Sequence, residues 1–129
     1  MSLRPLRALQ LNVARGHWRM VACLNALTDF DIILFQEPWY ARIGVARSST
    51  NPAGSDILGT VTNHAWESYV PMVNNDQHPR VATFVRKGVP FLSATPRPDM
   101  LNHPDLLPLS FHYGSLSFDL LNVYNAGSG

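Results

Sequence analysis

The sequence predicts a sheet-rich α/β protein, and three observations point to that class. The chain opens with a strand, an amphipathic helix and a second strand, and mainly strand-like segments follow. Ten prolines and eight glycines among 129 residues favour many turns over long helices. Hydrophobic residues make up 46% and charged residues 15% of the chain, which is the composition of a folded domain with its own core.

The opening strand–helix–strand unit is the clearest pattern. Residues 6–13 alternate apolar and polar side chains, which predicts a strand. Residues 17–28 are predicted to be helical because their apolar side chains recur at helical spacing (Met20, Cys23, Leu24 and Leu27). Residues 31–35 form a short, continuous apolar run that indicates a buried strand, and Pro38 ends it.

The rest of the chain predicts strands joined by loops. Residues 40–56 are polar and rich in turn formers, so we expect a surface loop there. One or two strands are expected in residues 57–73, a well-alternating strand in residues 80–86, and a last strand in residues 116–124. Residues 95–108 carry four prolines and are expected to be irregular.

Charge and cysteine content exclude several classes of protein. The formal net charge is +1, so no overall basic field attracts nucleic acid, and such affinity would need a local patch. Arg80, Arg86 and Lys87 are the candidates, although a basic strand end is more often a solvated face. The single cysteine, Cys23, excludes a disulfide framework and fits an intracellular location. No apolar run is long enough for a membrane helix, so no membrane partner is expected.

The chemistry is predicted where the first two strands end. A helix that joins two strands makes them parallel neighbours, so their carboxyl ends meet at one rim, where α/β proteins bind ligands. Asn12 and Glu37 end these strands, and the stretches leading to them have equal length, so the two side chains are expected nearly level. An amide oxygen beside a carboxylate suits magnesium. The alternatives are that Asn12 only makes a turn and Glu37 only faces water.

Aromatic residues allow two interpretations as well. Tyr124 lies on an apolar strand face, which favours a core residue with a tethered hydroxyl over a phosphate contact. The three tryptophans are expected to be core or rim anchors rather than platforms for stacked bases (Trp18, Trp39 and Trp66).

Four motifs resemble one known family. Residues 9–12 (LQLN), 35–39 (FQEPW), 79–85 (PRVATFV) and 122–125 (NVYN) occur in the order found in endonuclease/exonuclease/phosphatase domains. They look most like the endonucleases of fungal non-LTR retrotransposons. The resemblance implies a two-sheet α/β sandwich, hydrolysis of phosphodiesters, and nicking of DNA with magnesium or manganese.

The resemblance also implies roles for single residues. Glu37 matches the metal-binding glutamate, Asn12 the asparagine that supports metal and phosphate, and Tyr124 a tyrosine that contacts the scissile phosphate. The metal would polarise the phosphoryl oxygen and stabilise the leaving oxygen. The implied partners are DNA and, in a full-length protein, a reverse transcriptase, with an intracellular, nuclear location.

The sequence departs from the family pattern after its last motif. None of its aspartates begins an Asp-x-Asn pair, and no Ser-Asp-His is present, so the family's general base is missing. We therefore expect residues 1–129 to be about the first half of a domain, lacking its C-terminal half and inactive alone. Two alternatives stay open: a non-catalytic remnant or binding module, and a phosphatase- or phospholipase-like member of the fold.

Overall fold

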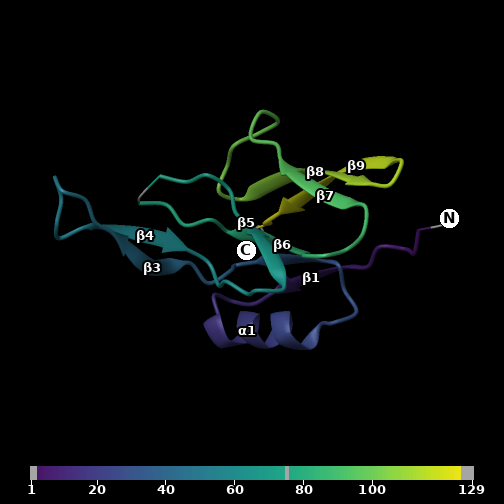
Figure 1. Cartoon of the computed structure of the whole chain (residues 1–129), viewed down its shortest axis with the longest axis horizontal. Helices are drawn as coiled ribbons and strands as arrows, with labels where there is room; N and C mark the ends of the chain where they lie inside the picture. Colours follow the sequence, from purple (N-terminus) through teal and green to yellow (C-terminus); the bar gives the residue numbers. More distant parts are fainter. Residues whose placement is uncertain (1–2, 75, 126–129) are drawn as a thin grey trace.

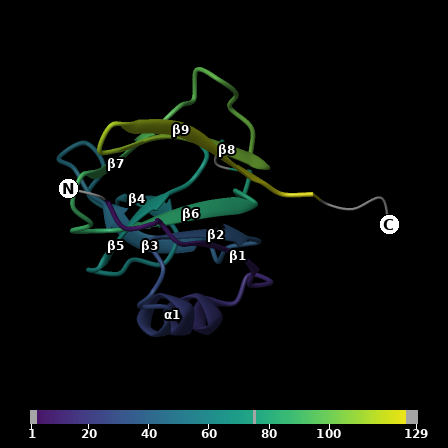
Figure 2. The same cartoon turned by 90° about the vertical axis from the view of Figure 1, so that its right-hand side faces the viewer.

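The computed structural model describes residues 3–74 and 76–125, and it shows three layers. A helix lies under a four-stranded sheet, a three-stranded sheet covers the other face, and a two-stranded hairpin projects from one end (Figures 1 and 2). Among the described residues, no helix has the length and apolar character required to cross a bilayer.

The four-stranded sheet forms the centre of the molecule. Its strand order is β1-β2-β6-β5, with bounds Ala8–Asn12, Ile32–Gln36, Val81–Arg86 and Trp66–Tyr69. Strands β1 and β2 are parallel, and they are joined through helix α1 (His17–Ala26), as the sequence predicts for a crossover unit. Strand β6 runs antiparallel to both β2 and β5, so the start of β6 lies at the rim where β2 ends.

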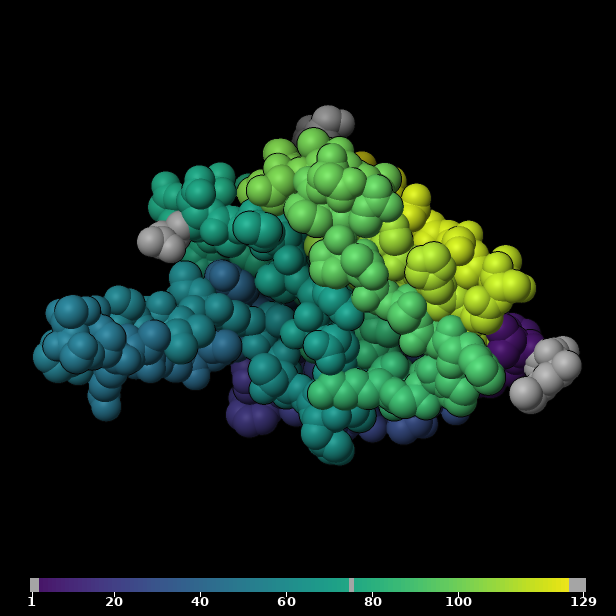
Figure 3. All heavy atoms as spheres, turned by 45° about the horizontal axis from the view of Figure 1, so that its top comes forward, coloured from purple at the N-terminus to yellow at the C-terminus, as the bar shows by residue number. Residues whose placement is uncertain are grey.

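The remaining strands form two smaller sheets. Strands β7, β8 and β9 pair in that order and are antiparallel, with bounds Leu92–Pro96, Leu106–Tyr113 and Leu116–Val123. Strands β3 and β4 form the hairpin, with bounds Ala41–Ala46 and Ser55–Gly59. Figure 3 shows this hairpin extending away from the body of the protein.

Strand alternation divides the apolar residues of the central sheet between two cores. Phe35, Ala82 and Phe84 point toward α1, where Met20 and Leu24 complete a buried cluster. The alternate residues of the same strands point toward the three-stranded sheet and pack against its inner face (Ile32, Leu34, Val81, Val85, Leu107, Leu109 and Phe111). The alternating strand expected in residues 80–86 is therefore confirmed as β6, and its two faces pack into different cores.

Two expectations about loops were wrong. Residues 40–56 are not only a loop, because β3 and the start of β4 lie within them; the hairpin is glycine-rich and mostly exposed, which hides the strand pattern. Residues 95–108 hold the end of β7 and the start of β8, so their prolines did not prevent strand pairing. Pro108 itself pairs opposite Leu121, just beyond the last β7–β8 pair (Pro96 with Leu109).

Candidate active site

The candidate site lies at one rim of the sandwich, where strand ends from both sheets meet. Strands β1, β2 and β9 arrive there with their carboxyl ends, and β6 and β8 leave from there. Backbone bonds lock this rim: Arg80 N–H donates to Pro104 O at 2.8 Å, and Tyr124 N–H donates to Asp105 O at 2.8 Å. Residues far apart in the sequence are thereby held side by side.

The register of β1 and β2 differs by one residue from the expected level arrangement. Asn12 pairs with Gln36, so Glu37 lies one position beyond the last pair. Strand alternation would then turn Glu37 toward the helix, on the side of Phe35. Instead Glu37 has a left-handed φ of 51°, which breaks the alternation and lets its carboxylate turn toward β9. The strained backbone is what aims this side chain.

Two further left-handed residues surround Glu37. Ala14 has φ 49° and Arg15 has φ 60°, and the Arg15 N–H donates to Glu37 O at 2.7 Å. On the other side, Glu37 N–H donates to Arg80 O at 2.9 Å. Backbone strain in non-glycine residues is costly and persists where surrounding contacts enforce it, which is typical of functional sites.

Tyr124 meets Glu37 at this rim. The Tyr124 hydroxyl donates to Glu37 Oε1 at 2.8 Å, so the two side chains face each other at this rim. The carboxylate is the main cause that raises the pKa of Tyr124 above its usual value, and partial burial adds to it. The hydroxyl therefore keeps its proton and stays a donor at neutral pH. The ring also packs against the core between the two sheets, as the interpretation of a core residue with a tethered hydroxyl predicts.

Arg80 adds positive charge beside the Glu37–Tyr124 pair. Its guanidinium carbon lies 5.4 Å from the centroid of the Tyr124 ring, and its Nε lies 3.4 Å from Asp105 Oδ1. The Arg80 side chain is about half exposed, so these contacts orient the cation without burying it. Of the three predicted basic residues, this is the one that reaches the rim.

Arg86 and Lys87 lie at the far end of β6. Arg86 lies six positions after Arg80 along the strand, which corresponds to roughly 20 Å. The Arg86 guanidinium donates to the carbonyls of Leu27 and Phe30 at 2.8 Å each and lies 4.3 Å from the Trp66 ring centroid. The structure thus gives Arg86 a contact with the end of the helix, and it does not bring Arg86 or Lys87 to Glu37.

Asn12 is held in a local turn. Its Oδ1 accepts the Ala14 N–H at 2.8 Å, as the turn interpretation predicts, while its position at the end of β1 keeps it at the same rim as Glu37. One lone pair of the amide oxygen is occupied by this bond, so Asn12 is better placed to fix the strained Ala14–Arg15 turn than to act as a main ligand.

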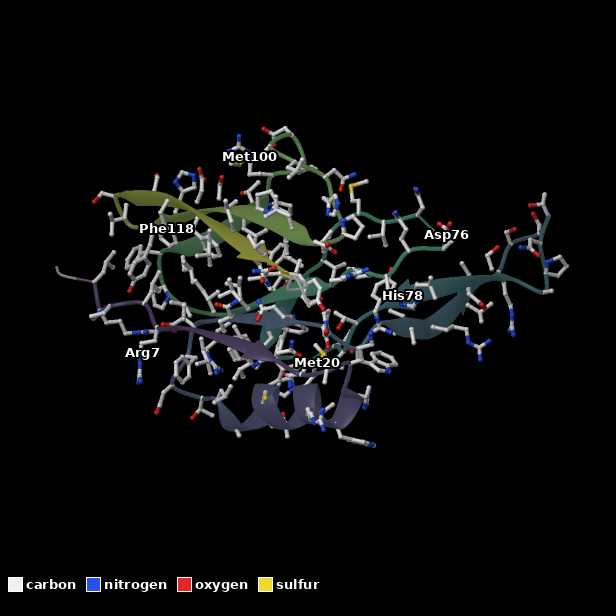
Figure 4. The ribbon with its side chains drawn as sticks, turned by 180° about the vertical axis from the view of Figure 1, so that it is seen from behind. Arg7, Met20, Asp76, His78, Met100 and Phe118 are labelled. Atoms are coloured by element: carbon white, nitrogen blue, oxygen red, sulfur yellow. The ribbon has the colours of Figure 1, made fainter. Side chains whose placement is uncertain are left out.

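A shallow pocket of about 890 Å³ opens beside Glu37. Its wall includes residues that the sequence did not single out, from the turn before α1 and the loops before β6 and β8 (Arg15, Asp76, His78, His103 and Asp105). Figure 4 shows Asp76 and His78 on the hairpin side of the molecule, with Arg7 and Phe118 toward the other end. Loop residues beside a strand end carry no periodic signal, so only the fold reveals them.

A buried polar bridge supports the site from behind. Asn122, which is 1% exposed, accepts a hydrogen bond from Gln36 Nε2 at 2.7 Å and donates to Ala82 O at 3.0 Å and Thr83 Oγ1 at 3.1 Å. It thereby ties β9 to β2 and β6, one residue before Glu37 and two before Tyr124. From the sequence, Asn122 is known only as the first residue of the motif at residues 122–125.

The residues present fit a hard cation in part. Within the described residues, no group of three or more histidines, cysteines or carboxylates is arranged to hold a metal ion. Glu37 still offers a half-buried carboxylate that is oriented through its Oε1 by the Tyr124 hydroxyl. Magnesium often needs only one or two protein carboxylates, with water and substrate phosphate completing its shell. Glu37 is thus the candidate ligand.

Fold and rim together define an α/β sandwich with a polar, carboxylate-bearing pocket at one end of its sheets. The chain matches no protein-family model and no curated protein sequence. Among solved structures it is similar to the endonuclease domain of TRAS1, a telomere-specific non-LTR retrotransposon, with a TM-score of 0.63 and 16% identity. The match covers 97% of this chain and 47% of that one, so the chain spans about half of the TRAS1 domain structure. The α/β fold prediction is confirmed.

Proposed function

We propose that this chain supplies the metal- and phosphate-binding part of a DNA-nicking endonuclease of the endonuclease/exonuclease/phosphatase family. The observation that carries the proposal is the Glu37 carboxylate with the Tyr124 hydroxyl 2.8 Å away at a strained, pocket-lining rim. The fold it shares with a retrotransposon endonuclease domain supports the proposal, and so does the order of its four motifs, which is that of the resembled family.

Each rim residue has a separate role in this proposal. Glu37 would hold magnesium or manganese, and Asn12 would fix the turn beside it. A metal bound there would polarise a phosphoryl oxygen and stabilise the leaving oxygen. On phosphate binding, the Tyr124 hydroxyl would turn its single donor from Glu37 to a phosphoryl oxygen, and Arg80 would neutralise part of the phosphate charge.

We further propose that residues 1–129 bind a phosphodiester without cleaving it. The sequence has no Asp-x-Asn or Ser-Asp-His, so no residue is assigned as the base that activates water. The chain would then act with the rest of an endonuclease domain and with a reverse transcriptase, on nuclear DNA. Alone, it would be a binding module, which is the second candidate function and which the missing base favours.

The metal proposal can be tested without any activity. Manganese broadens the NMR signals of nearby amides, so titration into the purified chain should broaden signals around Glu37. Glu37→Gln should abolish this broadening, whereas Glu67→Gln, the matched change at the exposed glutamate of β5, should keep it. Equal broadening in the Glu37→Gln variant would refute the assignment of Glu37 as the ligand.

Activity is tested with supercoiled plasmid and magnesium. We expect no nicking by residues 1–129. Magnesium-dependent nicking that disappears in Glu37→Ala would show instead that the chain is a complete enzyme. Cleavage of a small phosphoester without any action on plasmid would favour the phosphatase-like alternative.

A further inference from the structure

Trp18 is far more exposed than is usual for a tryptophan side chain. It lies in the first turn of α1 and is 76% exposed, whereas Trp66 is 2% exposed in the core below the sheet. The expectation that all three tryptophans are core or rim anchors is therefore wrong for Trp18. A single exposed apolar ring is normal on a protein surface, so Trp18 is informative only together with the residues around it.

The Trp18 ring belongs to a row of aromatic rings that leads into the pocket. His17 contacts Trp18 edge to face, with ring centroids 5.0 Å apart and an interplanar angle of 89°. On its other side His17 contacts Trp39 in the same manner, at 4.7 Å and 77°. Trp39 lines the pocket that holds Glu37. We call Trp18, His17 and Trp39 the aromatic row; it runs without interruption from open solvent to the candidate active site.

Positive charge accompanies the aromatic row. Arg15 lines the same pocket, Arg19 is exposed next to Trp18, and the first turn of α1 contains no acidic residue. An aliphatic partner surface would use the rings but would gain nothing from the guanidinium groups. A nucleobase attached to a phosphate uses both, because its flat face stacks on an aromatic ring and its phosphate attracts arginine.

We propose that the aromatic row binds an unpaired nucleobase next to the phosphate held at Glu37. The substrate class would be a nucleic acid strand with an unpaired or unstacked base beside the target phosphodiester. Trp18 would supply the outer stacking face, and Trp39 with His17 would guide the strand into the pocket. This inference rests on the proposed function, since it takes the pocket as the phosphate site.

The test compares two oligonucleotides that have the same backbone. One is a short oligothymidylate, and the other is an abasic strand with equal numbers of phosphates; binding to residues 1–129 is measured by fluorescence anisotropy with magnesium. We expect the oligothymidylate to bind about tenfold more tightly or better, because stacking is sequence-tolerant and strong. Trp18→Ala should remove this preference, and Trp18→Phe should retain part of it.

Matched controls separate stacking from phosphate binding. Phe91→Ala removes another exposed aromatic ring (61%, against 76% for Trp18) next to β7, at the end of the sandwich opposite the rim, and should keep the preference for bases. Glu37→Gln should weaken magnesium-dependent binding of both strands and leave their ratio unchanged. Equal affinity of the unchanged chain for both strands, no binding of either, or an unchanged preference in Trp18→Ala would each overturn the inference. If Glu37→Gln left magnesium-dependent binding of both strands unchanged while the preference for bases remained, the proposed function would be overturned instead.

Discussion

Substituting Asn122 tests whether the polar bridge behind the site holds the two sheets together. Asn122→Ala removes three hydrogen bonds of 2.7 to 3.1 Å and a longer one of 3.4 Å to Phe35 O, and it leaves the buried Gln36 amide without its acceptor. At about 1 kcal/mol per bond, with a further cost for the stranded amide, the free energy of unfolding should fall by about 3 to 4 kcal/mol. For a domain of this size the melting temperature should drop by roughly 10 to 20 °C.

Urea unfolding followed by circular dichroism measures this loss. The matched control is Val123→Thr, the next residue on the exposed face of β9, which should change stability by no more than about 0.5 kcal/mol. Because both partners of a bond can be replaced by apolar groups with little penalty, Gln36→Met combined with Asn122→Leu should cost less than the sum of the single changes. A loss below about 1 kcal/mol for Asn122→Ala, or strict additivity, would refute the bridge.

Two other predictions concern the same framework. The paired oxygens of buried Asp31 accept from Arg4 at 2.7 and 2.9 Å, and these bonds are the main cause that lowers the Asp31 pKa. The stabilisation from Asp31 is fully present above the pKa of this carboxyl in the unfolded chain, about 4, and is lost as the pH falls through its lower pKa in the folded protein. The difference in unfolding free energy between the unchanged chain and Asp31→Asn should therefore shrink in acid. A difference that stays constant with pH would contradict the assignment. At Glu37, the left-handed φ predicts that Glu37→Gly is about 1 kcal/mol more stable than Glu37→Ala in urea unfolding, whereas equal stability would show that no strain is stored there.

Sequence patterns predicted the helix and strands whose buried side chains recur with the period of that element. Helix α1 and strands β2 and β6 have buried stripes or faces, so their residues reveal both type and approximate bounds. Strands β3 and β4 have mostly exposed side chains, and their glycines and polar residues look like a loop. Strand β8 was missed because Pro108 lies inside it, where the end of the β7 pairing tolerates a missing donor.

The sequence predicted which residues belong to the candidate site better than it predicted how they are arranged. Glu37 and Tyr124 follow from motifs, and the rim follows from parallel pairing. The one-residue offset between Asn12 and Glu37, and the left-handed turn that compensates for it, depend on contacts with Arg15 and Arg80 that no local pattern encodes. Trp18 was misjudged because sequence composition describes how often a residue type is buried and says nothing of a single position.

The two strands that lead to Asn12 and Tyr124, β1 and β9, are both edge strands, so further strands could pair with them beside the site. Within the described residues, β1 and β9 each pair with a neighbour on one side only, so each presents a row of free backbone donors and acceptors. A strand added to either edge would run about 4.8 Å from the strand that carries Asn12 or Tyr124. Such a strand would cover the exposed sheet edge and at the same time bring new side chains to the pocket. The same backbone hydrogen bonds would then both protect the edge from aggregation and add functional groups to the site.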